Sequence, residues 1–315
     1  MQVPERDEVF RNHGVLQPVL RVILAQFLFL VVVSALTFPL LRWVVATHPG
    51  APLRDVWDLL DLIGPAGLVV AAWLQLVAAL GIAAVLTRRL DCQSLRALGL
   101  WRHAGWQREL GAGLALGALL IAGVFLALVA TGLALVEPSR DGWIRPAALG
   151  LVLLAPLALS EEIWFRGYVQ RNLTQGLGAW PALILTSAFF AVAHFSNPEK
   201  SAPGFLNIGL AGMVMGYAYL RSGSLWLPSG LHLTWNFTQS TVLGMPVSGI
   251  GLPSILETAL KTPHWISGGS FGPEGGLAGT VALGAGLAYL AWRYRGARPP
   301  EVAADTPEPA PPAGE

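Results

Sequence analysis

Residues 155–170 read APLALSEEIWFRGYVQ, and they place three charged side chains directly after an apolar run. No residue from 146 to 160 is charged, whereas Glu161, Glu162 and Arg166 follow at once. Such a cluster is ordinary where a helix reaches water, because acidic and basic residues four apart form surface ion pairs. At membrane depth the same charges are costly and usually mark a functional site. The rest of the chain has to decide between these two interpretations.

The composition is that of a membrane protein. Of 315 residues, 54% are hydrophobic and only 12% are charged, and the mean hydropathy is +0.56. A soluble domain carries about 25% charged residues, so this chain is predicted to be polytopic in a membrane. The net charge of +1 and the lack of a basic block argue against a nucleic-acid partner. The single cysteine, Cys92, leaves no disulfide framework and no cysteine metal cluster.

The apolar segments predict an all-α, polytopic transmembrane helix bundle of about eight spans. These spans cover residues 22–41, 62–87, 110–136, 147–164, 180–195, 205–220, 225–244 and 277–292. The sixth is rich in small residues, which allow neighbouring helices to pack closely. We divide the chain into an N-terminal segment (1–21), spans one to three (22–146), a catalytic core with spans four to eight (147–292) and a disordered tail rich in Pro, Ala and Glu (293–315).

The distribution of basic residues predicts the orientation. With eight spans, fourteen Lys and Arg residues fall on the side of both termini and six on the opposite side. Basic residues accumulate on the cytoplasmic side, so both termini are predicted to be cytoplasmic. Abundant Ala, Gly, Pro and Arg suggest a bacterial source, and therefore a multi-pass protein of the inner membrane.

Pairs of residues four apart, each with at least one polar side chain, occur on three of the predicted spans. This spacing places each pair on one helical face, so three helices can direct polar groups into one cavity between spans four, five and seven. It leaves Glu161 unpaired on another face, free to act as a general base. The pairs are Glu162 with Arg166, Phe190 with His194, and His232 with Asn236.

These residue types suit the hydrolysis of a carbonyl compound. Glu161 and His194 could polarise a water molecule for attack, and His232 and Asn236 could donate hydrogen bonds to the developing oxyanion. Taken singly, each has a structural explanation, such as an interfacial ion pair for Glu162 or a helix–helix contact for Asn236. Their conjunction on three neighbouring spans favours a catalytic site.

The order of the motifs resembles that of the CAAX protease and bacteriocin-processing (CPBP, or Abi) family, intramembrane endopeptidases that include the type II CAAX prenyl proteases. The matching stretches are SEEIWFRGYVQ (160–170), FAVAH (190–194) and HLTWN (232–236), and SGGSFGPEGG (267–276) is similar to a glycine-rich loop of bacterial members. The resemblance covers about residues 147–292. It implies that Glu161 and His194 activate water and that His232 and Asn236 stabilise the oxyanion. Glu162, Arg166 and Phe190 are then expected to support the site.

The resemblance leaves the metal and the substrate open. Glu161, His194 and His232 could bind zinc, but the His-Glu-x-x-His pair of many zinc proteases is absent. We favour a metal-free mechanism without a cofactor, with zinc as the alternative. The expected partners are the lipid bilayer and a membrane-anchored or CAAX-like peptide. The cavity is expected to open to the cytoplasm, because the glutamate pair is placed at the cytoplasmic end of span four.

Two other classes of function stay open, a non-catalytic immunity or scaffold protein that keeps the fold and a transporter. Short spans interrupted by proline can build a transport path, but the charges gather on three helices and no inverted repeat is visible. Residues 268–272 (GGSFG) match the Gly-x-Ser-x-Gly pattern of serine hydrolases, which requires a strand before the serine and a helix after it. In a loop rich in Gly and Pro this match is interpreted as a coincidence.

Overall fold

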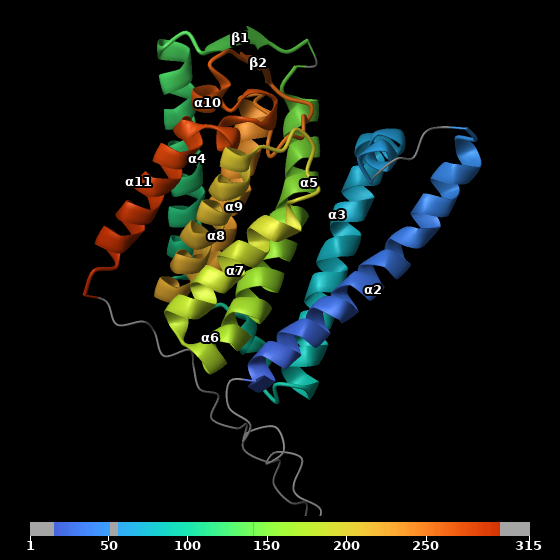
Figure 1. The fold of residues 1–315 in the computed structure, drawn as a ribbon, viewed down its shortest axis with the longest axis vertical. Helices are drawn as coiled ribbons and strands as arrows, with labels where there is room; N and C mark the ends of the chain where they lie inside the picture. Colours follow the sequence, from blue (N-terminus) through green and yellow to red (C-terminus); the bar gives the residue numbers. More distant parts are fainter. Residues whose placement is uncertain (1–15, 51–55, 141, 297–315) are drawn as a thin grey trace, which may run out of the picture.

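The computed structural model describes residues 16–50, 56–140 and 142–296. It is a bundle of helices with a two-stranded ribbon at one end, and α2 begins and α11 ends on the side away from this ribbon (Figure 1). The all-α membrane architecture predicted from the sequence is confirmed. Among the described residues, four helices are long and apolar enough to cross a bilayer: Gln17–Thr47, Leu62–Arg89, Trp106–Ala130 and Ile144–Leu177. The total of eight spans remains a prediction.

The bundle is formed by ten α-helices within the described residues. In chain order they are α2 (Leu16–Thr47), α3 (Val56–Arg89), α4 (Trp106–Ala130), α5 (Ile144–Glu161), α6 (Arg171–Leu177), α7 (Ala179–Ala193), α8 (Ala202–Ser222), α9 (Trp226–Asn236), α10 (His264–Ser267) and α11 (Leu277–Arg293). Short 3₁₀ segments are η1 (Leu95–Leu98), η4 (Gly269–Phe271) and η5 (Pro273–Gly275), and π-helical segments are η2 (Glu162–Gln170) and η3 (Phe237–Val242).

The ribbon pairs β1 (Ala134–Pro138) with β2 (Leu256–Leu260) in antiparallel register, Ala134 opposite Leu260. The predicted third span was therefore wrong at its end, because α4 stops at Ala130 and Gly132 turns the chain with a φ of 73°. Such a left-handed glycine is a common helix stop. Most of the predicted segment 1–21 and of the tail 293–315 lies outside the described residues.

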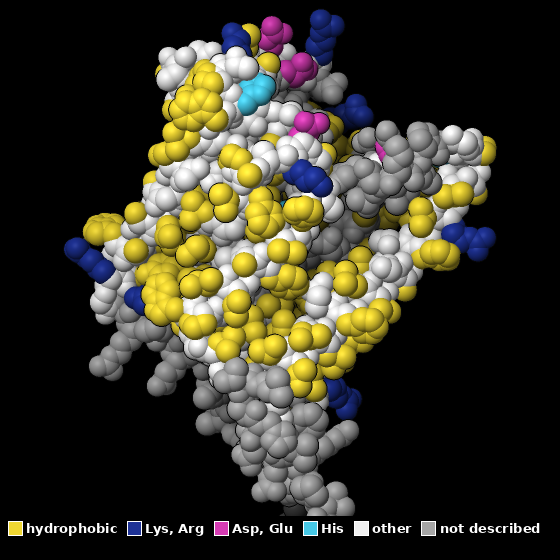
Figure 2. Space-filling model, in the orientation of Figure 1, with side chains coloured by type: hydrophobic (Ala, Val, Ile, Leu, Met, Phe, Trp, Pro, Cys, Tyr) yellow, Lys and Arg dark blue, Asp and Glu magenta, His cyan; other side chains and the backbone are white. Residues whose placement is uncertain are grey.

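Hydrophobic side chains cover the outward helix faces, and acidic side chains gather at the ribbon end (Figure 2). Large apolar residues such as Phe27, Leu119 and Leu206 are more than 60% exposed. Apolar patches of this size are rare on soluble monomers. They suit helices whose outer surfaces contact lipid.

The fourth predicted span is longer than the sequence suggested. α5 continues through η2 and α6 as one helix, Ile144–Leu177, instead of ending near Trp164. No proline interrupts residues 157–177, and the helix ends only at Gly178, whose φ is 82°. The glutamate pair therefore lies in the middle of a helix. The expectation that the pair lies at the end of this helix was wrong, whereas the opening of the cavity to the cytoplasm remains a prediction.

A buried carboxylate joins α2 and α3 to the long helix. Asp91, in the turn after α3, accepts hydrogen bonds from Arg171, from Asn172 at 3.3 Å and from Arg21 of α2 at 3.5 Å. The pKa of Asp91 is raised, because burial disfavours its charged form more than Arg171 and its other partners favour it. These contacts hold the first two helices against the bundle.

Glycines bring α4 and α9 into backbone contact. A Cβ added at Gly113 would lie 2.2 Å from the Leu227 carbonyl oxygen, and one at Gly117 would lie 2.3 Å from that of Leu231. From the facing helix, a Cβ at Gly230 would lie 2.6 Å from the Leu110 oxygen. Small residues at both surfaces allow this approach, which sets the position of the helix that carries His232 and Asn236.

We expect Gly117→Ala to destabilise the protein by about 1–3 kcal/mol, because the added methyl group forces α9 away from α4. Gly123→Ala on the same helix is the matched control, since a Cβ there has no atom within 4 Å. Thermal unfolding of the purified variants in detergent measures the difference. Equal unfolding temperatures for the two variants would contradict the close approach of these helices.

Candidate active site

The predicted polar residues line one cavity of about 620 Å³. Its walls come from α2, α3, α5, η2, α7, α8, α9, η5 and α11, and from the loops after α7 and η3. Glu161, His194, His232 and Asn236 all face it, together with Phe190. The structure thus brings together the four residues that were predicted to be catalytic.

A buried ion pair lies behind the cavity wall. Oε1 of Glu162 accepts hydrogen bonds from Nη1 of Arg166 and Nδ1 of His232, both at 2.8 Å. Glu162 and Arg166 are 0% exposed. The predicted pair of Glu162 with Arg166 is therefore present, but its contact with His232 was missed. Glu162 and His232 are 70 residues apart in the sequence, so no local sequence pattern reveals their contact.

Two further contacts hold Arg166. Its Nη2 donates to the Gly212 carbonyl oxygen of α8 at 3.2 Å, and its guanidinium carbon lies 4.6 Å from the centroid of the Phe190 ring. A desolvated guanidinium over an aromatic face is a favourable cation–π contact. The supporting role predicted for Phe190 thus has a physical basis, since this ring helps to solvate a buried charge.

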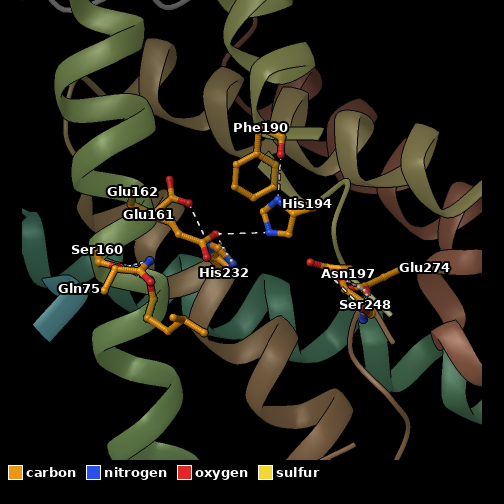
Figure 3. A network of polar contacts seen from close by, with 12 residues as sticks. Gln75, Ser160, Glu161, Glu162, Phe190, His194, Asn197, His232, Ser248 and Glu274 are labelled. Carbon is orange, nitrogen blue, oxygen red and sulfur yellow. Dashed lines mark hydrogen bonds and ion pairs between the residues drawn. The ribbon is translucent and has the colours of Figure 1, made fainter. Parts of the chain in front are cut away.

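Glu161 lies between the two histidines (Figure 3). Its Oε2 is 3.8 Å from Nε2 of His194 and 3.9 Å from Nε2 of His232. Both distances are too long for direct hydrogen bonds, and at this separation a water molecule can bridge the groups. The side chain of Glu161 is 16% exposed, in contrast with the fully buried Glu162. Adjacent in sequence, the two glutamates thus occupy different environments.

The second nitrogen of each imidazole is fixed by a hydrogen bond. Nδ1 of His194 lies 2.8 Å from the carbonyl oxygen of Phe190, an atom that can only accept. Nδ1 therefore carries the proton, and in the neutral ring Nε2 presents its lone pair to Glu161. His232 is held in the same way by the carboxylate of Glu162. Both Nε2 atoms are consequently available to a molecule beside Glu161.

Asn236 lies one helical turn after His232, at the end of α9, and faces the same cavity. In the part of the chain that the structure describes, its side-chain amide has no hydrogen-bond partner. The amide is thus free to donate to a bound molecule. Its role in stabilising an oxyanion remains a prediction.

The cavity also contains polar residues that the sequence interpretation missed. Glu274 of η5 accepts hydrogen bonds at Oε2 from the backbone N–H and the hydroxyl of Ser248, both 2.7 Å, and at Oε1 from Trp235 at 3.0 Å. Its pKa is raised because burial outweighs these hydrogen bonds. The available signal was an acid within the quoted GPEGG stretch, immediately before the last helix. On the opposite wall, Gln75 donates to Ser160 at 3.1 Å.

The GGSFG stretch (268–272) does not form a nucleophile elbow. It follows the short helix α10 rather than a strand, and the Ser270 hydroxyl donates to Glu199 at 2.8 Å. A Cβ at Gly268 would lie 1.7 Å from the Gly272 carbonyl oxygen, and both residues have left-handed φ values, 85° and 94°. The glycines thus serve a tight turn.

Across 16–50, 56–140 and 142–296, no group of three His, Cys, Asp or Glu side chains is arranged to hold a metal ion. Glu161, His194 and His232 remain the residues that would bind zinc in the alternative mechanism. The metal-free mechanism remains a prediction that chelation has to test.

Comparison with known proteins finds one family model, which matches part of the chain. Residues 141–238 match the family model described as type II CAAX prenyl endopeptidase Rce1-like. This region is an Rce1-like domain. No curated protein and no solved structure matches the chain.

The Rce1-like match includes all seven predicted site residues and confirms the family expected from the motifs. It supports a CAAX-type intramembrane protease in general and a location in a membrane. Glu274 lies beyond the Rce1-like match.

For the Rce1-like domain, we expect Arg166→Met to lower the free energy of unfolding by about 3 kcal/mol, because Glu162 then lacks its main counter-charge. The double variant Glu162→Gln/Arg166→Met should regain much of this stability, since no unpaired charge stays buried. Thermal unfolding in detergent checks both values. Arg145→Met, at the exposed start of the same helix, is the control. A double variant no more stable than Arg166→Met would contradict the pairing.

Proposed function

We propose that the protein is an intramembrane endopeptidase that hydrolyses a peptide bond of a membrane-anchored or CAAX-like substrate. The observation that carries the proposal is the position of Glu161, whose Oε2 lies 3.8 and 3.9 Å from two histidine Nε2 atoms. Because each ring is anchored through Nδ1, a water molecule between these groups meets one carboxylate and two oriented imidazoles.

Glu161 and His194 are the groups that activate this water. As the water oxygen attacks the scissile carbonyl carbon, its proton passes to the Glu161 carboxylate, and Nε2 of His194 orients the second O–H. The tetrahedral intermediate then collapses with cleavage of the C–N bond. Glu161 returns the proton to the leaving nitrogen, which becomes an amine. The carboxylate is thereby restored for the next cycle.

His232 and Asn236 are the proposed donors to the oxyanion. Asn236 can donate from its free amide. His232 can donate from Nε2 while its Nδ1 stays bonded to Glu162 only if the ring is an imidazolium, for which the Glu162 carboxylate is the counter-ion. Preorganised donors in a site without bulk water stabilise developing charge strongly.

The proposed endopeptidase function also implies where the protein is located and what it acts on. We place the protein in a bacterial inner membrane with cytoplasmic termini, acting on substrates held in the bilayer, without a cofactor unless zinc is required. The wall that α2 and α3 contribute carries Phe29, Leu30 and Leu68. This apolar wall suits a lipid-attached or hydrophobic segment of the substrate.

The test is cleavage of peptides by the purified protein in liposomes. We expect Glu161→Gln to reduce the rate at least about 100-fold, because the amide cannot accept the proton from water. The panel contains farnesylated CAAX peptides and unprenylated membrane-anchored peptides, with products identified by mass spectrometry. Glu257→Gln, at an exposed position on β2, is the matched control and should retain full activity.

A chelator separates the two mechanisms. Cleavage that needs Glu161 and is unaffected by chelation supports a metal-free glutamate mechanism. Cleavage abolished by a chelator and restored by zinc would overturn that mechanism and keep the endopeptidase. Equal rates for wild type and Glu161→Gln would overturn the role of Glu161.

A further inference from the structure

A tight turn closes one end of the cavity. Val247 and Ile250 exchange two backbone hydrogen bonds of 2.9 and 2.8 Å, and the residues between them, Ser248 and Gly249, have φ values of 48° and 86°. A left-handed conformation is ordinary for glycine but uncommon and strained for serine. The turn directs the chain that follows along the cavity wall, where Gly251 and Leu252 line the space.

Glu274 holds this turn in place. Both the N–H and the hydroxyl of Ser248 donate to one oxygen of its carboxylate, and Trp235 of α9 donates to the other. Burying a carboxylate is costly unless its oxygens are hydrogen-bonded. Here the hydrogen bonds stabilise the strained serine and join the turn to the helix that carries His232.

Asn197 connects the turn to the catalytic histidine. Its N–H donates to the His194 carbonyl oxygen at 3.1 Å, and its Nδ2 donates to the Ser248 carbonyl oxygen at 3.2 Å. Nδ2 is thus engaged, and Oδ1 remains as an acceptor on a side chain that lines the cavity. Figure 3 shows Asn197, Ser248 and Glu274 grouped across the cavity from Glu161, beyond His194.

The chain after the turn has unused backbone groups. Within the described residues, the backbone groups of Gly251 and Leu252 make no hydrogen bond. Gly251 is exposed and Leu252 is half-buried, so these N–H and C=O groups are accessible to a partner that enters the cavity. An extended peptide can be such a partner by lying alongside, as in the addition of a strand to a sheet edge. A substrate segment that is helical also has to unwind before its amide bond can be hydrolysed, because helical hydrogen bonds and side chains shield that bond.

We propose that Asn197, Gly251 and Leu252 form a docking edge that binds the main chain of an extended substrate segment next to Glu161, and that Glu274 is the positioning residue of this edge. This inference rests on the proposed endopeptidase function. In it, the Asn197 Oδ1 accepts one N–H of the substrate, and the backbone of 251–252 pairs with adjacent main-chain groups. Binding then depends on the backbone of the substrate in addition to any lipid it carries.

The experiment measures the affinity of the Glu161→Gln protein in detergent for a farnesylated CAAX peptide. It then measures the affinity for a series of the same peptide in which one backbone N–H at a time is methylated. We expect one or two neighbouring methylations to weaken binding about tenfold, the loss of one hydrogen bond. Asn197→Ala, introduced into the Glu161→Gln protein, should weaken binding of the unmethylated peptide about tenfold. In the Asn197→Ala variant, methylation of the N–H that Asn197 binds should cause little further loss of affinity, because that hydrogen bond is already absent. Ser270→Ala, an exposed hydroxyl outside the cavity, is the control.

Glu274→Gln tests the positioning role in the cleaving enzyme. It should raise KM about tenfold with little change in kcat or in the pH profile, because the edge is displaced while Glu161 and His194 stay in place. Methylation effects that are uniform along the peptide, or unchanged by Asn197→Ala, would overturn the docking edge. If the wild type cleaves no peptide, the proposed function fails, while the binding series still decides whether the edge exists.

Discussion

The arrangement of the site depends on the buried contact of Glu162 with Arg166 and His232. Two opposite charges without water are tolerable only with good geometry and further hydrogen bonds, and here these come from three helices. Arg166 reaches the backbone of α8, Glu162 reaches His232 on α9, and the aromatic ring of Phe190 on α7 covers the guanidinium. A displacement of any of these helices would remove a hydrogen bond or an aromatic contact from a buried charge. The free-energy cost of losing these contacts keeps the catalytic groups aligned with one another.

The neighbouring glutamates lie at the junction of α5 and η2 in different environments, because successive side chains of a helix point about 100° apart. Glu162 is directed into the protein and Glu161 into the cavity, so one stabilises the structure and the other is free to react. π-helical turns are rare and often occur at functional sites. Within one continuous helix, two adjacent carboxylates can therefore serve different purposes without a loop at membrane depth, where unpaired backbone groups are costly.

Much of the site could be predicted from the sequence. Residues four apart lie on the same face of a helix, and charged residues are rare enough in an apolar chain to mark a site. The pairing of Glu162 with Arg166 and the convergence of Glu161, His194 and His232 were foreseen on this basis. The course of the long helix beyond Trp164 was not, because buried polar residues such as Gln170 and Arg171 resemble the end of a span. Glu274 was overlooked because its partners, Ser248 and Trp235, are distant in the sequence.

The backbone contact between α4 and α9 has a consequence for the limits of the folding unit. The helix that carries His232 and Asn236 is seated on Gly113 and Gly117, which precede the Rce1-like match, and Glu274 follows it. A fragment comprising only 141–238 would expose the bare backbone of Gly230 to lipid and would lose the carboxylate that holds the cavity turn. The segment that matches the family model is therefore smaller than the segment that must fold together. In α4, larger residues at positions 113 and 117 are excluded by the close approach of the α9 backbone.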